Sequence, residues 1–149
     1  MHMHMQSVGE LMTRSDLVTI TETQNLAKAE ELLRLHRIRH LPVVRDGKLV
    51  GLVTHRDLLK AAAQCGGADP AQQALWASDM MVRDVKTVRA DTPSREALKL
   101  MLENKFGCLP VVRADGTLIG ILTEADMVRY AQHLIEDMDR RSLAAEYEA

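Results

Sequence analysis

HLPVVRDGKLVGLVTHRDLL, residues 40–59, returns as CLPVVRADGTLIGILTEADMV at residues 108–128. With one gap at Ala114, 11 of the 20 aligned positions are identical. An internal repeat of this kind fixes the architecture, because each copy folds as the same supersecondary unit. We therefore expect two repeats, at residues 8–63 and 77–135.

The sequence around each copy predicts the same order of elements. A short strand, at residues 17–20 or 85–88, precedes a helix whose apolar residues recur at helical spacing. Asp-Gly between two apolar runs is a strong hairpin signal within the repeated stretch. A second helix then begins near Arg56 or Glu124. The predicted order is β-α-β-β-α, twice, which is an α/β (α+β) fold.

The first helix of each repeat has a defined apolar side and, in the second repeat, a start signal. Thr92 is the expected N-cap and Pro93 the expected first helical residue. The last helix is expected to run to about Arg141, because no glycine or proline stops it. The apolar positions are Leu26, Ala29, Leu32 and Leu33 in the first repeat, and Ala97, Leu98, Met101 and Leu102 in the second.

The segments outside the repeats differ from them in composition. Residues 64–76 contain glycine and proline and are expected to form a linker. Trp76, Met80 and Met81 are expected to be core anchors where the repeats meet. Residues 136–149 are charged and are expected to be a solvated or partly disordered tail, although a longer helix there could help a dimer form.

The composition excludes several classes of protein. Hydrophobic residues make up 46% of the 149 residues and charged residues 27%, which excludes a disordered chain. No apolar run approaches the roughly 20 residues of a membrane-spanning helix, and no secretory signal opens the chain. A net charge of −2 and 3% aromatic residues argue against nucleic-acid binding. Cys65 and Cys108 form no disulfide framework, so we expect a reducing cytoplasm.

Three features in both repeats resemble a tandem pair of CBS domains, the Bateman module named after cystathionine β-synthase. They are Leu-Pro-Val-Val, the Asp-Gly hairpin, and the ending apolar-Gly-apolar-apolar-Thr-x-x-Asp. The resemblance covers about 115 residues. It implies two repeats related by pseudo-two-fold symmetry, with clefts between them. In many members these clefts bind AMP, ADP, ATP or S-adenosylmethionine, and members often associate as dimers of pairs.

The two Thr-x-x-Asp endings have a structural and a functional interpretation. Thr54 with Asp57, and Thr123 with Asp126, have the spacing of capping boxes, which stabilise helix starts. The same helix start is also an anion site, and a carboxylate one turn in can accept hydrogen bonds from a ribose. The resemblance implies that each Asp holds ribose and each Thr holds ribose or phosphate. From the residues alone both interpretations stay open.

The resemblance also implies an adenine pocket, formed by the first strand of each repeat and the segment before each Leu-Pro. The apolar members of this set are also plausible core residues. The matching positions are Thr19, Ile38, Leu41 and Pro42, and Thr87, Phe106, Leu109 and Pro110.

Basic residues distinguish the first repeat from the second. Arginine is favoured for binding phosphate, so this asymmetry predicts unequal clefts and favours Asp57 over Asp126 as the ribose ligand. The first repeat carries Arg39, His55 and Arg56, where the second carries Gly107, Glu124 and Ala125.

The leading hypothesis is a stand-alone regulatory module, not an enzyme. It would bind an adenosine-containing nucleotide and signal by rearranging a homodimer or a separate, unknown effector protein. The homodimer is expected to form through apolar faces of the second helices, at residues 58–59 and 127–128. The alternative is a structural dimerisation or interaction scaffold with vestigial clefts.

A third hypothesis is a metal-responsive protein that uses the histidines of the Met1–Met5 tract, although a frayed terminus is the favoured interpretation. The other histidines have no metal-ligand spacing. Neither cysteine has a partner that would make it a nucleophile. We therefore expect no catalytic site, no metal site and no resident cofactor.

Overall fold

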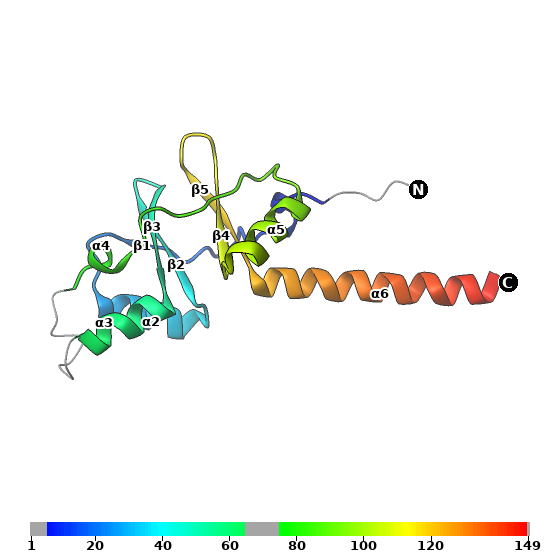
Figure 1. Cartoon of the computed structure of the whole chain (residues 1–149), viewed down its shortest axis with the longest axis horizontal. Helices are drawn as coiled ribbons and strands as arrows, with labels where there is room; N and C mark the ends of the chain where they lie inside the picture. The colour runs from blue at the N-terminus through cyan, green and yellow to red at the C-terminus, as the bar shows by residue number, and fades with distance from the viewer. Residues whose placement is uncertain (1–5, 65–74, 149) are drawn as a thin grey trace.

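The computed structural model describes residues 6–64 and 75–148 (Figure 1). The Met1–Met5 tract, Cys65 and most of the predicted linker lie outside the described residues. The first repeat contains β1 (Ile20–Thr21), α2 (Leu26–His36), β2 (His40–Arg45), β3 (Lys48–Thr54) and α3 (His55–Gln64). The second contains α5 (Ser94–Asn104), β4 (Cys108–Val112), β5 (Leu118–Thr123) and α6 (Glu124–Glu148). Short helices α1 (Val8–Leu11) and α4 (Ala77–Met80) precede them.

The repeated stretch forms an antiparallel hairpin in both repeats, as predicted. Asp46 and Gly47 join β2 to β3 with φ angles of 52° and 78°, and two successive positive angles are typical of a tight two-residue hairpin turn. The turn between β4 and β5 is longer, as Ala114 predicts, and of its residues only Gly116 has a positive φ, 89°. The two hairpin tips are hydrogen-bonded to each other.

Equivalent residues take equivalent places in the two hairpins. Pro42 and Pro110 are fully buried and occupy the third position of β2 and β4. The register confirms the internal repeat, because aligned residues have aligned partners: His40 with Thr54 and Cys108 with Thr123, and Pro42 with Leu52 and Pro110 with Ile121.

The first strand of each repeat is shorter than predicted. Of residues 17–20 only Ile20 is in a strand, and β1 pairs parallel with β2 for two residues. A single bridge between Val88 and Val111 replaces the strand expected at 85–88. The reason is that the chain just before each of these segments is bonded to the other repeat, so it crosses between sheets there.

The opening residues of each repeat pack on the other repeat. Val8 of α1 has no exposed surface and belongs to the core of the second repeat. Ala77 of α4 and Met81 belong to the core of the first. Met81 is therefore an anchor, as expected, whereas Trp76 is 47% exposed and is not. Sequence inspection treated each repeat as contiguous and so missed this exchange.

Backbone hydrogen bonds fix each exchanged segment. The amide and carbonyl of Thr13 bond Ile121 of β5 at 2.8 and 3.0 Å. Val82 bonds Leu52 of β3 in the same manner, with both distances 2.9 Å. Each hairpin therefore gains a neighbour from the opposite repeat, and neither repeat is complete without the other.

The exchange explains the glycine of the apolar-Gly-apolar motif. A Cβ atom at Gly51 would collide with the Sδ atom of Met81. A Cβ atom at Gly120 would lie 2.6 Å from the Sδ atom of Met12, which is also too close. Glycine is required at both places because a methionine from the exchanged segment lies directly over the strand.

Helix α5 differs from its prediction at both its start and its apolar face. It begins at Ser94 with Pro93 as the N-cap, while the Thr92 hydroxyl accepts a hydrogen bond from the Arg89 amide at 3.0 Å. Thr92 therefore closes a local turn and is not the N-cap. Of the apolar positions, Leu102 is 78% exposed and does not contribute to the core.

Helix α6 is longer than predicted. It continues past Arg141 to Glu148, so residues expected to be a solvated or partly disordered tail are helical. Figure 1 shows the second half of α6 projecting away from both sheets. Among the described residues, no helix is both long enough and apolar enough to cross a bilayer.

Candidate functional site

Both Thr-x-x-Asp endings lie where a strand becomes a helix, and both form complete capping boxes. In the first repeat the Thr54 amide donates to Asp57 Oδ2 at 2.9 Å, and the Asp57 amide donates to Thr54 Oγ1 at 3.2 Å. In the second repeat the matching distances are 2.8 and 3.3 Å, between Thr123 and Asp126. The structural interpretation therefore applies to both endings, and each helix start is stabilised by it.

The carboxylate of Asp126 has further partners. Its Oδ1 atom accepts hydrogen bonds from the Thr13 hydroxyl at 2.9 Å and from the Arg129 guanidinium. The Thr123 hydroxyl donates to Oδ2 at 3.1 Å. Asp126 is 4% exposed. Both oxygens are engaged, so in this conformation Asp126 has little capacity for a ligand.

The carboxylate of Asp57 has fewer partners. The residues aligned with Thr13 and Arg129 are Val82, which has no hydroxyl, and Lys60. Within residues 6–64 and 75–148 no donor bonds Oδ1 of Asp57, and its side chain is partly exposed. The two endings are alike in sequence but differ in how much hydrogen-bonding capacity remains.

A cleft of about 210 Å³ lies between β3 and the segment that leads into the second repeat. Arg83 and Thr87 line it on one side and Gly51 on the other. β3 rises about 3.3 Å per residue, so Thr54 lies about 10 Å from Gly51 along the strand. The Thr54–Asp57 ending is therefore not part of the lining of this cleft, which is Leu49, Val50, Gly51, Arg83, Val85, Thr87, Val112 and Gly116.

The predicted basic residues of the first repeat lie at the surface. Arg39, His55 and Arg56 are exposed, and the Arg39 carbonyl accepts the His55 amide at 2.9 Å. This bond joins the segment before β2 to the start of α3. Arg83, which sequence inspection did not select, lines the cleft. The signal for it is its alignment with Arg14, near the start of the first repeat.

The segments before β2 and β4 meet where the repeats join. A Cβ atom at Gly107 would lie 2.7 Å from Nε2 of His40 and 3.6 Å from Oε1 of Glu124. Glycine at 107 therefore leaves room for the His40 ring at the place where the two repeats join. Burial lowers the pKa of His40, an effect that Glu124 opposes and Arg39 reinforces. Sequence inspection did not select His40 as a site residue.

The apolar candidates for an adenine pocket are mostly core residues in this structure. Leu41 and Leu109 have no exposed surface, and Ile38 and Phe106 pack against the two cores. Thr19 is partly buried just before β1. Of the predicted adenine positions, Thr87 is the one that lines the 210 Å³ cleft.

Cys108, at the start of β4, is buried and free. Burial raises the pKa of its thiol to about 12. The thiolate is the nucleophilic form, so Cys108 is unreactive at neutral pH. No cluster of histidine, cysteine and acidic residues able to hold a metal ion occurs in the part of the chain that the structure describes.

Comparison with known proteins agrees with the internal repeat. The family model for the CBS domain matches residues 8–64 and 77–133. The chain therefore belongs to the CBS-domain family and contains two CBS domains.

The relatives that match this pair of domains are of two kinds, a CBS domain-containing protein and a longer enzyme. The chain is 33% identical to the chloroplastic CBS domain-containing protein CBSX1 of Arabidopsis thaliana, over 91% of this chain and 68% of the relative. It is 35% identical to inosine-5'-monophosphate dehydrogenase of Korarchaeum cryptofilum, but over only 23% of that enzyme. The similarity to an enzyme is thus limited to a part of it.

Two similar solved structures contain adenosine compounds. CBSX2 in complex with AMP has a TM-score of 0.76 and 36% identity, over 87% of this chain and 98% of that chain. The CBS domain pair of MJ0100, in complex with 5'-methylthioadenosine and S-adenosyl-L-methionine, has a TM-score of 0.74 and 28% identity, again over 87% and 98%.

Proposed function

We propose that this protein is a non-catalytic regulatory module that binds an adenosine-containing ligand between its CBS repeats. The ligand class comprises AMP, ADP, ATP and S-adenosylmethionine. The observation that carries the proposal is the remaining hydrogen-bonding capacity of the Asp57 carboxylate, in the first turn of the helix that follows β3. Similar proteins in complex with AMP and S-adenosyl-L-methionine support it.

Asp57 is the proposed ribose ligand. A carboxylate accepts through two oxygens, and the two hydroxyls of a ribose are both donors. The capping bond occupies Oδ2 of Asp57, and Oδ1 is available to a hydroxyl. Asp126 serves instead as a structural residue, because Thr13, Thr123 and Arg129 already use its oxygens. One ligand per chain is the expected stoichiometry.

The rest of the ligand would lie along β3. Thr87 and the apolar wall of the cleft would contact the base. A phosphate would be bound by Arg83, with Arg56 or His55 at the start of α3, because guanidinium groups form charge-assisted hydrogen bonds to phosphate oxygens. Thr54 would contribute its hydroxyl to ribose or phosphate.

Signalling would depend on the cleft between the repeats, because both repeats contribute residues to it. A ligand can shift the arrangement of the repeats only by binding one arrangement more tightly than another. The cleft is formed by residues of both repeats, so the bound ligand favours one spacing of β3 and the 83–87 segment. A separate effector protein would sense that change. A reducing, cytoplasmic location fits the buried free thiol.

A scaffold without a ligand is the second candidate. The complete capping boxes favour it, because they explain both Thr-x-x-Asp endings without any ligand. The two candidates differ in what Asp57→Asn would do. Asparagine keeps the size and capping ability of aspartate but removes the charge.

Thermal unfolding and calorimetric titration with AMP, ATP and S-adenosylmethionine test the proposal. A ligand at 100 times its Kd should stabilise the protein by about 2.7 kcal/mol. Asp57→Asn should weaken its binding about tenfold, because a hydrogen bond to a charged group is lost. Asp126→Asn is the matched control and should bind with wild-type affinity. Absence of binding by the wild-type protein to all three compounds would favour the scaffold.

A further inference from the structure

The starts of α3 and α6 approach the same place from opposite repeats. The Arg39 carbonyl accepts the His55 amide at 2.9 Å, and the Gly107 carbonyl accepts the Glu124 amide at 3.3 Å. A Cβ atom at Gly107 would lie 2.7 Å from Nε2 of His40 and 3.6 Å from Oε1 of Glu124, so both side chains reach one point. This place, formed by His40, Gly107 and Glu124, is the junction of the two repeats.

The junction adjoins the proposed ribose ligand of the first repeat. His40 is the cross-strand partner of Thr54. Residues directly opposite each other in an antiparallel pair have Cβ atoms about 4.5–5.5 Å apart, on the same face of the sheet. Thr54 in turn bonds Asp57 in the capping box. Only the side chain of His40 therefore separates Glu124 of the second repeat from the Thr54–Asp57 ending of the first.

Glu124 brings a negative charge to a place that the first repeat makes basic. Its side chain is exposed, and in residues 6–64 and 75–148 it forms no ion pair. Burial lowers the pKa of His40, Glu124 raises it and Arg39 lowers it, so both charges act on the His40 ring. The second repeat adds no cation to match those of the first, because Arg39, His55 and Arg56 align with Gly107, Glu124 and Ala125.

A ligand bound as proposed directs its 5' substituent toward the junction. The base and the 5' substituent of a nucleoside extend from the ribose in different directions. With the ribose on Asp57 and the base in the cleft beside Gly51, the first phosphate would lie at the start of α3, near His55 and Arg56. Each further phosphate would extend the ligand past α3 toward Glu124.

We propose that Glu124 determines specificity, by accepting an adenosine ligand with one phosphate group or none and disfavouring a diphosphate or triphosphate. This inference rests on the proposed function, with the ribose bound by Asp57. Like charges placed in contact lower the affinity for an unwanted ligand, which is a common source of specificity. A cationic 5' substituent, as in S-adenosylmethionine, would instead be attracted by the same carboxylate.

Calorimetric titration of the full chain with AMP, ATP and S-adenosylmethionine tests the specificity, without Mg²⁺ because that ion would neutralise part of the ATP charge. The wild type should bind AMP about tenfold more tightly than ATP. Glu124→Gln keeps the size of the side chain but removes its charge, so the affinity for ATP should rise about tenfold and that for AMP less. The affinity for S-adenosylmethionine should fall about threefold. Glu124→Asp keeps the charge and should still discriminate against ATP.

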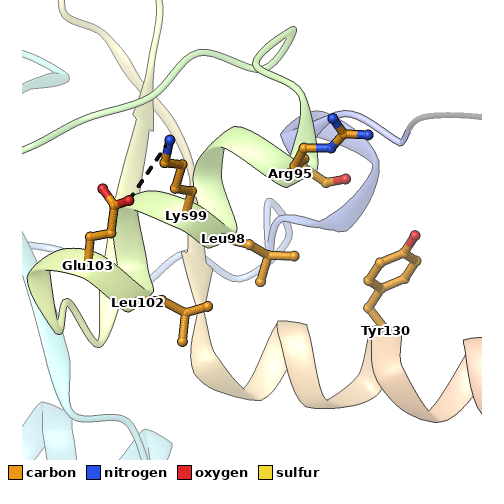
Figure 2. Close-up of a pocket in the computed structure, with 7 residues that line it drawn as sticks. Arg95, Leu98, Lys99, Leu102, Glu103 and Tyr130 are labelled. Atoms are coloured by element: carbon orange, nitrogen blue, oxygen red, sulfur yellow. Dashed lines mark ion pairs between the residues drawn. The ribbon is translucent and has the colours of Figure 1, made fainter.

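Glu96→Gln is the matched control. Glu96 is an exposed acidic residue in the first turn of a helix, as Glu124 is. It lies on α5 beside Arg95, at the groove between α5 and α6 that Figure 2 shows, and the 11 residues of α5 separate that end from the junction. The variant makes the same change in net charge, so all three affinities should stay at their wild-type values.

NMR titration of His40 without ligand checks the contact itself. Glu124→Gln should lower the pKa of His40, because the charge that raises it is removed. An unchanged pKa would overturn the proposal. So would a Glu124→Gln variant whose affinities for AMP and ATP change by the same factor, or a wild type that prefers ATP.

The proposed function can fail separately. If Asp57→Asn still weakens binding while Glu124→Gln leaves the ratio of ATP to AMP affinity unchanged, the ribose site stands and only the role of Glu124 is removed. A wild type that binds none of the three compounds would remove the proposed function, and the role of Glu124 with it.

Discussion

At the scale of single residues, the two aspartates that look equivalent in sequence have different roles. Asp126 is bonded by a threonine from the exchanged segment that opens the first repeat and by an arginine one turn along α6. Among the residues that the structure describes, Asp57 has only its capping box. Sequence comparison could align the two aspartates, but it could not identify Thr13 as a partner, because 113 residues separate it from Asp126.

The difference predicts unequal losses of stability. Asp126→Ala should reduce the free energy of unfolding by about 3 kcal/mol, because charged hydrogen bonds are lost in a buried place. Asp57→Ala should cost about 1 kcal/mol, the usual loss of a helix cap. Urea unfolding measures both. Equal losses would mean that the extra bonds of Asp126 contribute nothing.

His40 predicts a dependence of stability on pH. Burial among Gly107, Glu124 and Arg39 lowers its pKa in the folded protein below the ordinary 6.5. As pH falls through 6.5, the unfolded chain binds a proton at His40 before the folded protein does, so stability falls. The contribution of His40 to stability is fully present above that pH.

His40→Gln should therefore flatten the loss of stability between pH 7.5 and pH 5.5, as measured by urea unfolding at several pH values. His133→Gln, at an exposed position on α6, is the matched control. A wild-type slope that His40→Gln leaves unchanged would assign the loss to another group.

At the scale of elements, the hairpins could be predicted and the first strands could not. The hairpins follow from local chemistry, since Asp46 and Gly47 adopt the positive φ angles of the turn and the flanking runs are apolar. The length of each first strand depends on the chain just before it, and that chain is hydrogen-bonded to the other repeat. The length of α6 was underestimated because the charged composition of residues 136–149 suggested a solvated tail, although no glycine or proline stops the helix there.

The glycine in β3 provides a test of the exchanged segment. Gly51→Ala places a Cβ atom against Met81, so it should destabilise the protein by about 2 kcal/mol, as overpacking of a core does. Gly47→Ala is not a suitable control because that residue has a positive φ, 78°. The appropriate comparison is Met81→Ala combined with Gly51→Ala, which should cost less than the sum of the two single variants. Additive losses, measured in urea, would contradict the contact.

At the scale of the whole molecule, the repeats form one cooperative body. Each core contains a segment that belongs, in chain order, to the other repeat. The site is shared in the same way, because residues of both repeats line the cleft. The sequence indicated the pair of repeats and both Thr-x-x-Asp endings. It could not show which carboxylate remains available, because that depends on the exchange.

Val8 predicts where a mutation near the start of the chain acts. Val8→Ala should cost about 2 kcal/mol, because a buried side chain is truncated. Hydrogen exchange should show the loss of protection first in β4 and β5, which belong to the repeat that Val8 completes, and less in β2 and β3. Loss confined to β2 and β3 would contradict the exchanged packing.

The exchange of α1 and α4 also governs how the chain can fold while it is being synthesised. Ribosomes add about 5–20 residues per second, and domains tend to fold as their residues emerge. Here the first repeat lacks Ala77 and Met81 of its core until well after α3 has emerged. Val8 and Gly9 wait for Ala90 and Thr92, and Thr13 waits longer still, until β5 appears. Neither repeat can complete its hydrophobic core early on the ribosome. The nascent chain therefore keeps apolar surface exposed for most of its synthesis.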